Sequence, residues 1–378
     1  MPSRDESEAM RMAGFHEAED FYPADFPADA PTIALEKISL SRIINEDNDE
    51  AKRLFELCRT TGFFYLDMLD HHIGRQLWRS ACRVHQMGRQ KFKDTPVEEK
   101  LKYKTRPGVR VFDRGYLMRT AYEGQQSADL EILNIPQSEF FGQSAPDGTG
   151  LPHWIPAEEH EDFKDALECG NTVARSILSV LERQLQLPTH TLTSLHHLTD
   201  DSGDFVRVLR YGGVPPSIKD EPEGFPPHRD AMSVAIVFNW VGGLQIPATG
   251  AKVDGYTVQD ADWRWVKPEP GYAIVNLGDA MAIYTNQLLK SQIHRVVKAP
   301  GEQRQHDRFS VIIATRPENT SPMKAFESPV IPRSEGVEKP MTSLEWGYSV
   351  VSKIQQRSVK RGATDLDNLV NSKQEFKV

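Results

Sequence analysis

Two histidines and one aspartate are the residues of this chain whose types and spacing could do chemistry. His228 and Asp230 stand one residue apart at the mouth of a predicted strand, and His294 begins another strand 66 residues later. Residues i and i+2 of a strand share a face, so His228 and Asp230 can bind one ion while Arg229 faces away. A non-adjacent strand must supply the third ligand. Two imidazoles and one carboxylate form the facial triad that holds Fe(II) and leaves positions open for substrate and O₂.

A second tripeptide of the same kind, His160-Glu161-Asp162, opens a predicted helix. Residues i and i+2 of a helix diverge by about 200° around the axis, so this pair cannot chelate one metal in the same way. Carboxylates at a helix start instead suit the helix dipole. We expect no metal there. Taken without other residues, His228 and Asp230 would fit a solvated turn equally well.

Arg308 and Ser310 form a candidate anion-binding pair at the head of a predicted strand, 14 residues after His294. They share a strand face, where a planar guanidinium fork and one hydroxyl suit a carboxylate. Because an unpaired arginine inside a barrel would be costly, a bound dicarboxylate would explain it. The alternative is a surface arginine near the start of a strand.

Arg304 competes with Arg308 for this role, since it follows His294 by ten residues. Spacing alone does not separate them. Arg304 lies in a polar turn (G-E-Q-R-Q-H-D) that no strand follows, whereas Arg308 begins an apolar run that continues to Ala314. We therefore predict that Arg308 binds the carboxylate and that residues 300–307 form an enlarged hairpin loop.

The hydrophobic pattern predicts the elements that would position these residues. Helical spacing of apolar residues predicts a helix from Asp49 that gives way to a short strand over 62–66, and helices over about 73–93 and 158–187. After residue 204, short β-branched or aromatic runs are divided by Gly, Pro and Asp. The seven strand candidates are 206–211, 232–240, 244–247, 272–277, 281–284, 294–297 and 309–315. This spacing predicts a β-sandwich or barrel.

The chain divides into four regions. Residues 1–30 alternate charges with Pro and Ala and predict a loose N-terminal arm. Residues 31–155 form an N-terminal region whose part from about 105 to 155 predicts long ordered loops, which often cover a site. Residues 156–335 hold a long helix and the strand-rich core. Residues 336–378 form a charged tail with one amphipathic helix around 344–354.

Composition excludes several classes of protein. The 378 residues carry 45 Lys and Arg against 54 Asp and Glu, a net charge of −9, which lacks the basic footprint of a nucleic-acid binder. A mean hydropathy of −0.51 and the lack of a long apolar run argue against a membrane span. Three scattered cysteines without a C-x-x-C pair favour a reducing compartment. Since the N-terminus is acidic and polar, we expect a soluble, cytoplasmic protein.

Five segments in this order resemble the isopenicillin-N-synthase-like family of Fe(II)/2-oxoglutarate-dependent dioxygenases. They are H-R-D at 228–230, G-G-L-Q at 242–245, V-N-L-G-D at 275–279, H-R-V-V at 294–297 and R-F-S at 308–310. Residues 61–69 and 95–103 look like that family's N-terminal domain. The resemblance covers about residues 33–335, and the sequence that follows His294 is more similar to fungal members of the family than to plant members.

The resemblance implies a mainly β fold, a double-stranded β-helix (jelly-roll) core flanked by helices with an α/β N-terminal region. Iron would be held by His228, Asp230 and His294. The keto-acid end of 2-oxoglutarate would chelate iron, and its far carboxylate would meet Arg308 and Ser310, helped by Tyr211. The family's N-x-Y-P-P appears here as L-R-Y-G-G-V-P-P, so a core tyrosine is the competing interpretation of Tyr211. Two further residues, Asn276 and Leu244, match family positions beside the iron, and packing explains both equally well.

The activity that the resemblance implies consumes O₂ and 2-oxoglutarate, releases succinate and CO₂, and oxidises a C–H bond of a small specialised metabolite. Hydroxylation, desaturation and cyclisation are all compatible, with ascorbate as a candidate reductant. Residues 105–155 and 344–354 are expected to wall the substrate pocket. Two alternatives stay open: an oxidase of the same fold that uses Arg308 and Ser310 to hold its substrate's own carboxylate, and a metal-free jelly-roll binding module.

Overall fold

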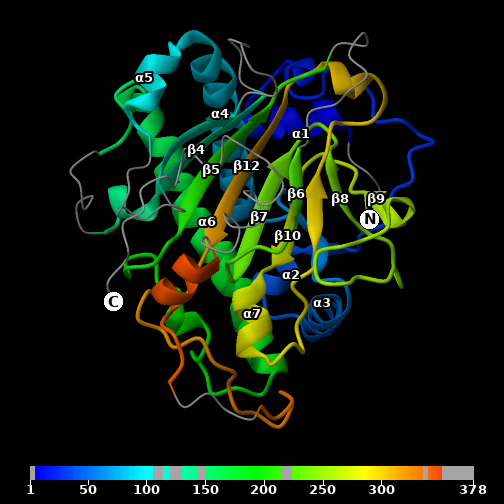
Figure 1. Ribbon diagram of the computed structural model, residues 1–378, viewed down its shortest axis with the longest axis vertical. Coiled ribbons are helices and arrows are strands. Elements are labelled where there is room, and N and C mark those ends of the chain that lie inside the picture. Colours follow the sequence, from blue (N-terminus) through cyan, green and yellow to red (C-terminus); the bar gives the residue numbers. More distant parts are fainter. Residues whose placement is uncertain are drawn as a thin grey trace.

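Two β-sheets stand face to face at the centre of the molecule (Figure 1). The computed structural model describes residues 5–104, 114–119, 129–142, 150–214, 224–334 and 339–350. The larger sheet has the strand order β1 (Lys37–Ser39), β2 (Phe63–Asp67), β10 (Tyr272–Leu277), β7 (Val234–Asn239), β12 (Arg308–Thr315), β5 (Phe205–Tyr211), β4 (Leu130–Pro136) and β3 (Gly115–Arg119). The smaller sheet has the order β6 (Phe225–His228), β11 (His294–Val296), β8 (Leu244–Pro247) and β9 (Trp263–Trp265).

Side chains of alternate residues in the larger sheet lie in two different environments. On β12, Phe309, Val311 and Ile313 belong to the main core beneath the helices. Ile312, between them, packs against a separate cluster in the space between the two sheets, as does Val296 of the smaller sheet. The period-2 alternation of a strand therefore separates the structural face from the inner face of the sandwich. Arg308 and Ser310 share the inner face with Ile312.

Helices cover the outer face of the larger sheet. The two long helices α4 (His72–Asp94) and α6 (Ala157–Gln184) pack against each other and against β12 and β5, and α3 (Asn48–Thr60) and α2 (Leu40–Ile44) pack beside α6. A Cβ at Gly170 of α6 would lie 2.6 Å from Ile313 Cγ2, so this glycine lets the helix approach the sheet closely. The predicted helices and the two-sheet core with its flanking helices are confirmed.

Residues 5–30 do not form the loose arm that was predicted. Helix α1 (Glu6–Ala13) starts at Asp5, whose side chain accepts a hydrogen bond from the Ser7 N–H. Ala9 and Met10 are fully buried, and the Ala9 carbonyl accepts a hydrogen bond from Trp78 Nε1 at 3.1 Å. The prediction failed because an eight-residue helix shows too little of its period to stand out among charges. This helix packs on α4, and the 3₁₀ turn η1 (Ala18–Asp20) follows it.

Two further predictions about elements are wrong. Residues 281–284 belong to helix α7 (Asp279–Tyr284), not to a strand, since a short apolar run does not by itself distinguish the two. The stretch 105–155 is not only loops, because β3 and β4 lie within it and form an edge of the larger sheet. The charged residue Glu131 interrupts the apolar pattern that would have predicted β4. It is buried in the structure because it pairs with Lys100 and Arg210. Residues 105–113, 120–128 and 143–149 of that stretch lie outside the described residues.

Smaller elements complete the described chain. They are α5 (Val97–Leu101) and the 3₁₀ turns η2 (Gln137–Glu139), η3 (Thr193–Leu195), η4 (Asp260–Asp262) and η5 (Gly301–Gln305). Residues 343–350 are helical, as predicted for the start of the C-terminal helix, whereas 351–354 lie outside the described part.

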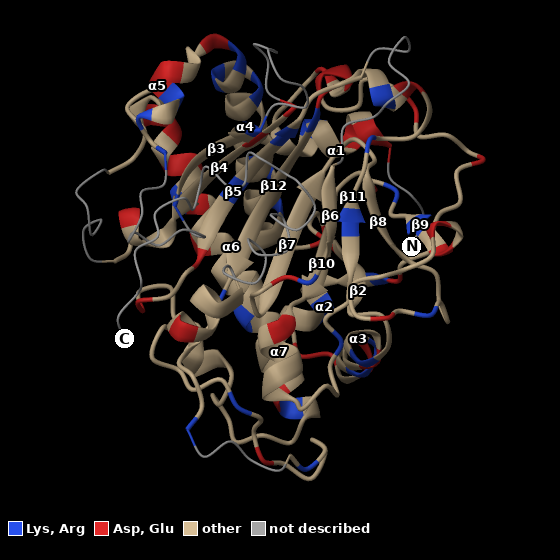
Figure 2. Ribbon diagram, in the orientation of Figure 1, with Lys and Arg blue, Asp and Glu red and all other residues tan. Residues whose placement is uncertain are grey.

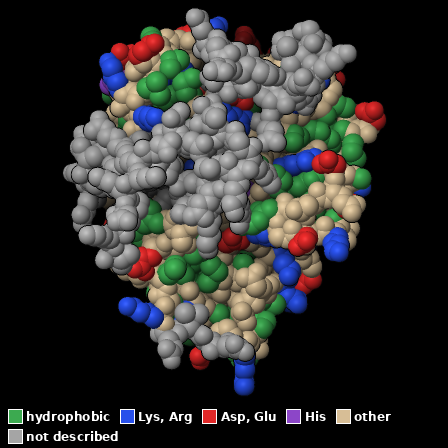
Figure 3. All heavy atoms as spheres, viewed as in Figure 1, with side chains coloured by type: hydrophobic (Ala, Val, Ile, Leu, Met, Phe, Trp, Pro, Cys, Tyr) green, Lys and Arg blue, Asp and Glu red, His purple; other side chains and the backbone are tan. Residues whose placement is uncertain are grey.

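Charges of both signs are interspersed over the helices. Figure 2 shows acidic and basic residues alternating on α3 and α5, while the central strands carry few of either. On the face seen in Figure 3, the visible hydrophobic groups are small and separated by polar and charged side chains. None of the helices in the described ranges combines the length and the apolar character needed to cross a bilayer.

The docking of α1 predicts that Met10→Ala lowers the free energy of unfolding by about 2 to 5 kcal/mol, because it leaves a cavity beneath a fully buried side chain. Met341→Ala is the matched control, since Met341 is 53% exposed and its loss should change stability by less than about 0.5 kcal/mol. Urea unfolding followed by circular dichroism measures both. Equal stability of the two variants would mean that α1 does not pack as described.

Candidate metal centre

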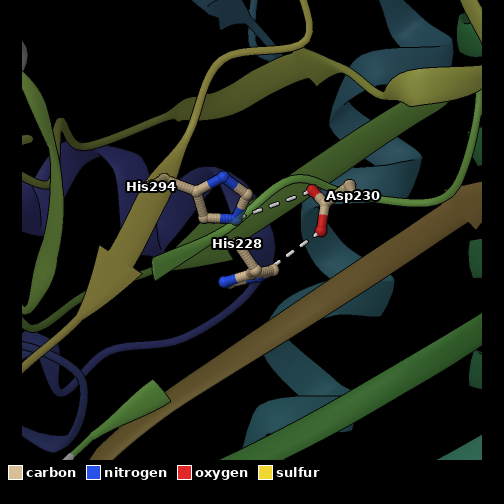
Figure 4. A group of neighbouring side chains, drawn as sticks. All are labelled: His228, Asp230 and His294. Carbon is tan, nitrogen blue, oxygen red and sulfur yellow. Dashed lines mark ion pairs between the residues drawn. The ribbon is translucent and has the colours of Figure 1, made fainter. Parts of the chain in front are cut away.

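His228, Asp230 and His294 meet in the space between the sheets (Figure 4). His228 is the last residue of β6, Asp230 follows it by two residues, and His294 is the first residue of β11. The two strands are far apart in the chain but directly paired, with His294 opposite His228 in antiparallel register. The strand that supplies the third ligand is therefore distant in the sequence but is a direct neighbour in the sheet. The two imidazole ring centroids lie 4.1 Å apart.

Backbone carbonyls orient both imidazoles toward the carboxylate. Nδ1 of His228 lies 2.9 Å from the Pro226 carbonyl oxygen, and Nδ1 of His294 lies 3.3 Å from the Gln292 carbonyl oxygen. With Nδ1 as donor, Nε2 is the atom left for a metal. These Nε2 atoms lie 3.6 Å and 3.7 Å from the two oxygens of Asp230. One ligand atom from each residue lies within 4.8 Å of the others, a donor set that fits a single Fe(II).

The charges around Asp230 favour the forms of these residues that bind metal. Burial raises the pKa of Asp230, but His294, His228 and the Asn276 amide lower it more, so the net pKa lies well below the usual range. Burial and the neighbouring His228 lower the pKa of His294 to about 4. An ionised carboxylate and a neutral imidazole are the required ligand states, so near neutral pH binding requires no proton release from either residue.

The segment V-N-L-G-D supports Asp230 from the neighbouring sheet. Asn276 Nδ2 donates to Asp230 Oδ2 at 2.8 Å, and the Asp279 N–H donates to the Asp230 carbonyl at 2.7 Å. A Cβ at Gly278 would lie 2.2 Å from the Met232 carbonyl oxygen, so only glycine allows this approach. The structure thus places Asn276 in hydrogen-bond contact with a triad residue, whereas Leu244 lies in an apolar cluster.

Arg229 points away from the triad, as predicted, and joins two loops. Its Nε donates to the Ser291 carbonyl at 3.0 Å and its Nη1 to the Gly255 carbonyl at 3.1 Å. Ser291 stands three residues before His294, so this side chain links the segments that carry the triad. Sequence reasoning missed this role because nothing in the order of residues shows which carbonyls a side chain will reach.

Arg308 is a buried cation on the inner face, only 4% exposed. Its Nε donates to the Gly242 carbonyl at 2.9 Å, its Nη1 donates to Ser310 Oγ at 3.3 Å, and its guanidinium lies 5.4 Å from the centre of the Tyr211 ring. Tyr211 is directly opposite Arg308 in the β12–β5 register. Among the residues that the structure describes, no carboxylate forms an ion pair with Arg308. Burial lowers the pKa of this guanidinium.

Gly243 makes room for the guanidinium of Arg308. A Cβ there would lie 2.7 Å from Arg308 Nε, and its φ of 136° is one that other residues rarely adopt. The motif G-G-L-Q therefore has a steric role that sequence reasoning did not assign. The double glycine itself was the available signal, because two adjacent glycines before a strand indicate a close backbone approach.

The rejected candidates lie elsewhere. His160 and Asp162 are on α6, where His160 Nε2 contacts the Ile155 carbonyl and Asp162 pairs with Arg83. Within the described ranges, the triad is the group whose ligand atoms could hold a metal. Residues 300–307 are not the predicted hairpin loop, because they connect β11 of the smaller sheet to β12 of the larger one. Arg304 lies on the 3₁₀ turn η5 within this connection, and no strand starts there. The prolines of L-R-Y-G-G-V-P-P lie outside the described residues.

Comparison with known proteins identifies the family. A family model described as the 2OG-Fe(II) oxygenase superfamily matches residues 203–317. A 2-oxoglutarate-dependent dioxygenase of Aspergillus fumigatus is 38% identical over 358 residues, 91% of this chain and 92% of that protein. The chain belongs to the 2OG-Fe(II) oxygenase superfamily. A second relative, a 2-oxoglutarate-dependent dioxygenase of Gibberella zeae, is 28% identical over 306 residues, which are 80% of this chain and 85% of the relative.

Solved structures of this superfamily share the fold. A full-length Neurospora crassa protein, solved in complex with alpha-KG and 5-formyluracil, has a TM-score of 0.64 at 18% identity and covers 86% of this chain and 97% of its own. JOX2 in complex with 2OG, Fe and JA has a TM-score of 0.58 at 22% identity and covers 86% of this chain and 87% of its own. The predicted double-stranded β-helix is thereby confirmed.

Membership decides between the three activities that the sequence left open. The protein is a 2-oxoglutarate-dependent dioxygenase, an oxidoreductase whose Fe(II) is held by a His-Asp-His triad and whose co-substrate is 2-oxoglutarate. A metal-free module and an oxidase that does without 2-oxoglutarate do not fit these findings. The solved relatives bind small molecules together with 2-oxoglutarate.

The contact between Asn276 and Asp230 predicts that Asn276→Ala weakens metal binding about 10- to 100-fold, because the carboxylate loses the amide that orients it. Titration of the metal-free protein with Co(II), followed by visible absorption, measures the affinity. Asn171→Ala is the control, since Asn171 of α6 is also buried but its amide donates to the His196 carbonyl and not to a triad residue. Equal metal affinity in the two variants would show that the amide does not support the ligand.

Proposed function

We propose that His228, Asp230 and His294 hold one Fe(II), and that the enzyme oxidises a C–H bond of a small specialised metabolite. The observation that carries this proposal is the convergence of the three side chains from paired strands, with both Nε2 atoms turned toward one carboxylate. Hydroxylation, desaturation and cyclisation all begin with oxidation of a C–H bond. The site therefore indicates the class of reaction rather than which of these products forms.

Arg308, Ser310 and Tyr211 bind the far carboxylate of 2-oxoglutarate in this proposal. A buried guanidinium whose described partners are a carbonyl and a hydroxyl keeps its full positive charge for an anion. Ser310 supplies one more donor on the same face, and Tyr211 lies directly across from Arg308. A dicarboxylate that reaches from the triad to Arg308 explains why a cation is buried there.

The chain's own residues bind and orient the reactants. When bound, Fe(II) and 2-oxoglutarate supply the activation of O₂ that oxidises the substrate. His228, Asp230 and His294 leave one side of the metal position open, while Asn276, Gly278 and Arg229 keep their backbone and side chains in place. Arg308 anchors the co-substrate at a distance from the metal, so that only its keto-acid end reaches the triad.

A small molecule is the substrate class that the relatives support. One relative was solved with JA, another with thymine, and a third is described as a rice dioxygenase for auxin oxidation. The A. fumigatus relative supports a fungal type of enzyme. Within the stretch 105–155, the described strands β3 and β4 are proposed to wall the substrate pocket together with the helix that starts at residue 343. Residues 105–113, 120–128 and 143–149 of that stretch lie outside the described residues. Three buried cysteines, none of them in a disulfide, support a reducing, cytoplasmic setting.

The triad predicts that His294→Ala loses stoichiometric iron and enzymatic turnover together, because two protein ligands remain where three are needed. His160→Ala should keep both, since His160 lies on α6 and contacts only a backbone carbonyl among the contacts described. Iron content after anaerobic reconstitution and succinate formation measure the two effects. A His294→Ala protein with full iron would rule out this ligand assignment.

The co-substrate assignment predicts a large difference between two arginine variants. Arg308→Ala should cost about 2 to 5 kcal/mol in 2-oxoglutarate binding, because a desolvated bidentate partner is lost. Arg304→Ala should cost less than about 1 kcal/mol. The apparent KM for 2-oxoglutarate, from succinate formation, measures both. A large rise for Arg304→Ala with little change for Arg308→Ala would transfer the role to Arg304.

A further inference from the structure

We propose that Asp307 is a positioning residue that holds Arg308 and Tyr211 in place for 2-oxoglutarate without touching it. The inference rests on the proposed function, since it concerns the residues that would bind the far carboxylate of the co-substrate. Sequence reasoning assigned no role to Asp307, which it placed in the loop 300–307. In the structure, Asp307 is the residue immediately before β12.

One carboxylate fastens both sides of Tyr211 to the start of β12. Asp307 Oδ2 accepts a hydrogen bond from Arg210 Nε at 2.7 Å, and Asp307 Oδ1 accepts one from the Gly213 N–H at 2.9 Å. Arg210 directly precedes Tyr211, and Gly213 follows it by two residues. The side chain of Asp307 therefore links the segment around Tyr211 to the residue next to Arg308.

The strand pairing leaves these two residues at the end of a ladder. Arg308 is the first residue of β12 and Tyr211 is the last residue of β5, and they are paired across these neighbouring strands (Figure 1). On the other side, β7 pairs with β12 only from Ser310 onward. The ends of an element open more easily than its centre, because fewer contacts hold them. A contact just beyond the end pair opposes such opening.

The arginine that bonds Asp307 is itself fixed by a buried carboxylate. Arg210 Nη1 pairs with Glu131 Oε2 at 2.9 Å, and the other oxygen of Glu131 accepts hydrogen bonds from Lys100 Nζ and Tyr116 Oη. A guanidinium held by a charge-assisted bond of this kind offers its Nε to Asp307 in a defined direction. The position of the Asp307 carboxylate is therefore set from the outer face of the sheet.

Asp307 and Arg308 serve opposite sides of the larger sheet. Arg308 bonds Ser310 on the inner face, whereas Asp307 pairs with Arg210 on the outer face. The Asp307 side chain is 40% exposed, so its ion pair contributes little to the stability of the whole protein. Asp307 thus acts on the co-substrate site through the placement of Arg308.

Backbone contacts keep this region folded when the carboxylate is altered. The Val214 N–H donates to the Arg304 carbonyl at 2.9 Å, and a Cβ at Gly213 would lie 2.3 Å from the Gln305 carbonyl oxygen. The Asp307 side chain takes no part in either contact. Loss of its carboxylate should therefore shift the end pair rather than detach it.

The sign of the effect separates a positioning role from a simple effect of charge. Asp307 brings a negative charge next to Arg308 in the chain, so removal of that charge alone should strengthen the binding of an anion. Misplacement of the guanidinium should weaken it, since charge-assisted hydrogen bonds depend on distance and direction. The two explanations predict opposite changes in the affinity for 2-oxoglutarate.

The test uses two ligands that differ only at the far carboxylate. Full-length enzyme loaded with Co(II), without O₂, is titrated calorimetrically with 2-oxoglutarate and with 2-oxovalerate, which has a methyl group in place of that carboxylate. We expect Asp307→Asn to weaken 2-oxoglutarate binding at least about fivefold and to leave 2-oxovalerate binding and Co(II) affinity unchanged. Asp307→Glu keeps the charge but displaces the carboxylate, so it should weaken 2-oxoglutarate binding as well.

Asp20→Asn is the matched control, because Asp20 also pairs with an arginine, Arg89 of α4, and its side chain is 42% exposed. It should bind both ligands as the wild type does, and each variant should melt within about 3 °C of the wild type. An Asp307→Asn protein that binds 2-oxoglutarate as tightly as the wild type, or more tightly, would overturn the inference. So would an equal weakening of 2-oxovalerate binding. Should Asp307→Asn not fold, Asp307→Glu decides by the same criteria.

The wild-type titrations separate the two levels of the proposal. Wild-type enzyme that binds 2-oxoglutarate no more tightly than 2-oxovalerate would contradict the proposed function of Arg308 itself. A wild-type preference for 2-oxoglutarate that persists unchanged in both Asp307 variants would contradict only the role of Asp307.

Discussion

The antiparallel pairing of His228 with His294 is the constraint on which the rest of the site depends. It brings two imidazoles from distant parts of the chain to within ring contact of each other, and the short step from His228 to Asp230 adds the carboxylate. A one-residue slip of this register would turn one imidazole to the opposite face of the sheet. The tight packing of Gly278 and the hydrogen bonds made by Arg229 fix the loops that flank His228 and His294. These contacts therefore help to maintain the register of the two strands.

The two faces of the larger sheet accommodate buried charge in different ways. On the outer face, Glu131 is fully surrounded but paired with Lys100 and Arg210. On the inner face, the described contacts of Arg308 are neutral oxygens and a ring. Burying a charge is costly unless it is paired, so the first arrangement satisfies the buried charge within the fold, while the second is the reason we propose that Arg308 binds an anion. This contrast distinguishes the paired charge of Glu131 from the charge of Arg308 that we propose binds 2-oxoglutarate.

The residues that could be predicted from sequence are those whose geometry is local. Strand alternation is enough to place Asp230 beside His228, and Ser310 beside Arg308. The pairing of β6 with β11, the close approach at Gly243 and the reach of Arg229 depend on segments far apart in the chain, so no local pattern reveals them. Among the elements, α6 is long enough to show its period, whereas α1 and α7 are too short to do so.

Iron at this site would also act as a cross-link. The three ligands enclose the chain between Asp230 and His294, which includes β7, β8, β9 and β10 and therefore strands of both sheets. A metal bound only by the folded chain stabilises it in proportion to the logarithm of its free concentration over its dissociation constant. Both the β6–β11 pairing and a bound metal would therefore hold the two ends of this long loop together. As a result, the thermal stability of the protein would rise with the free concentration of Fe(II).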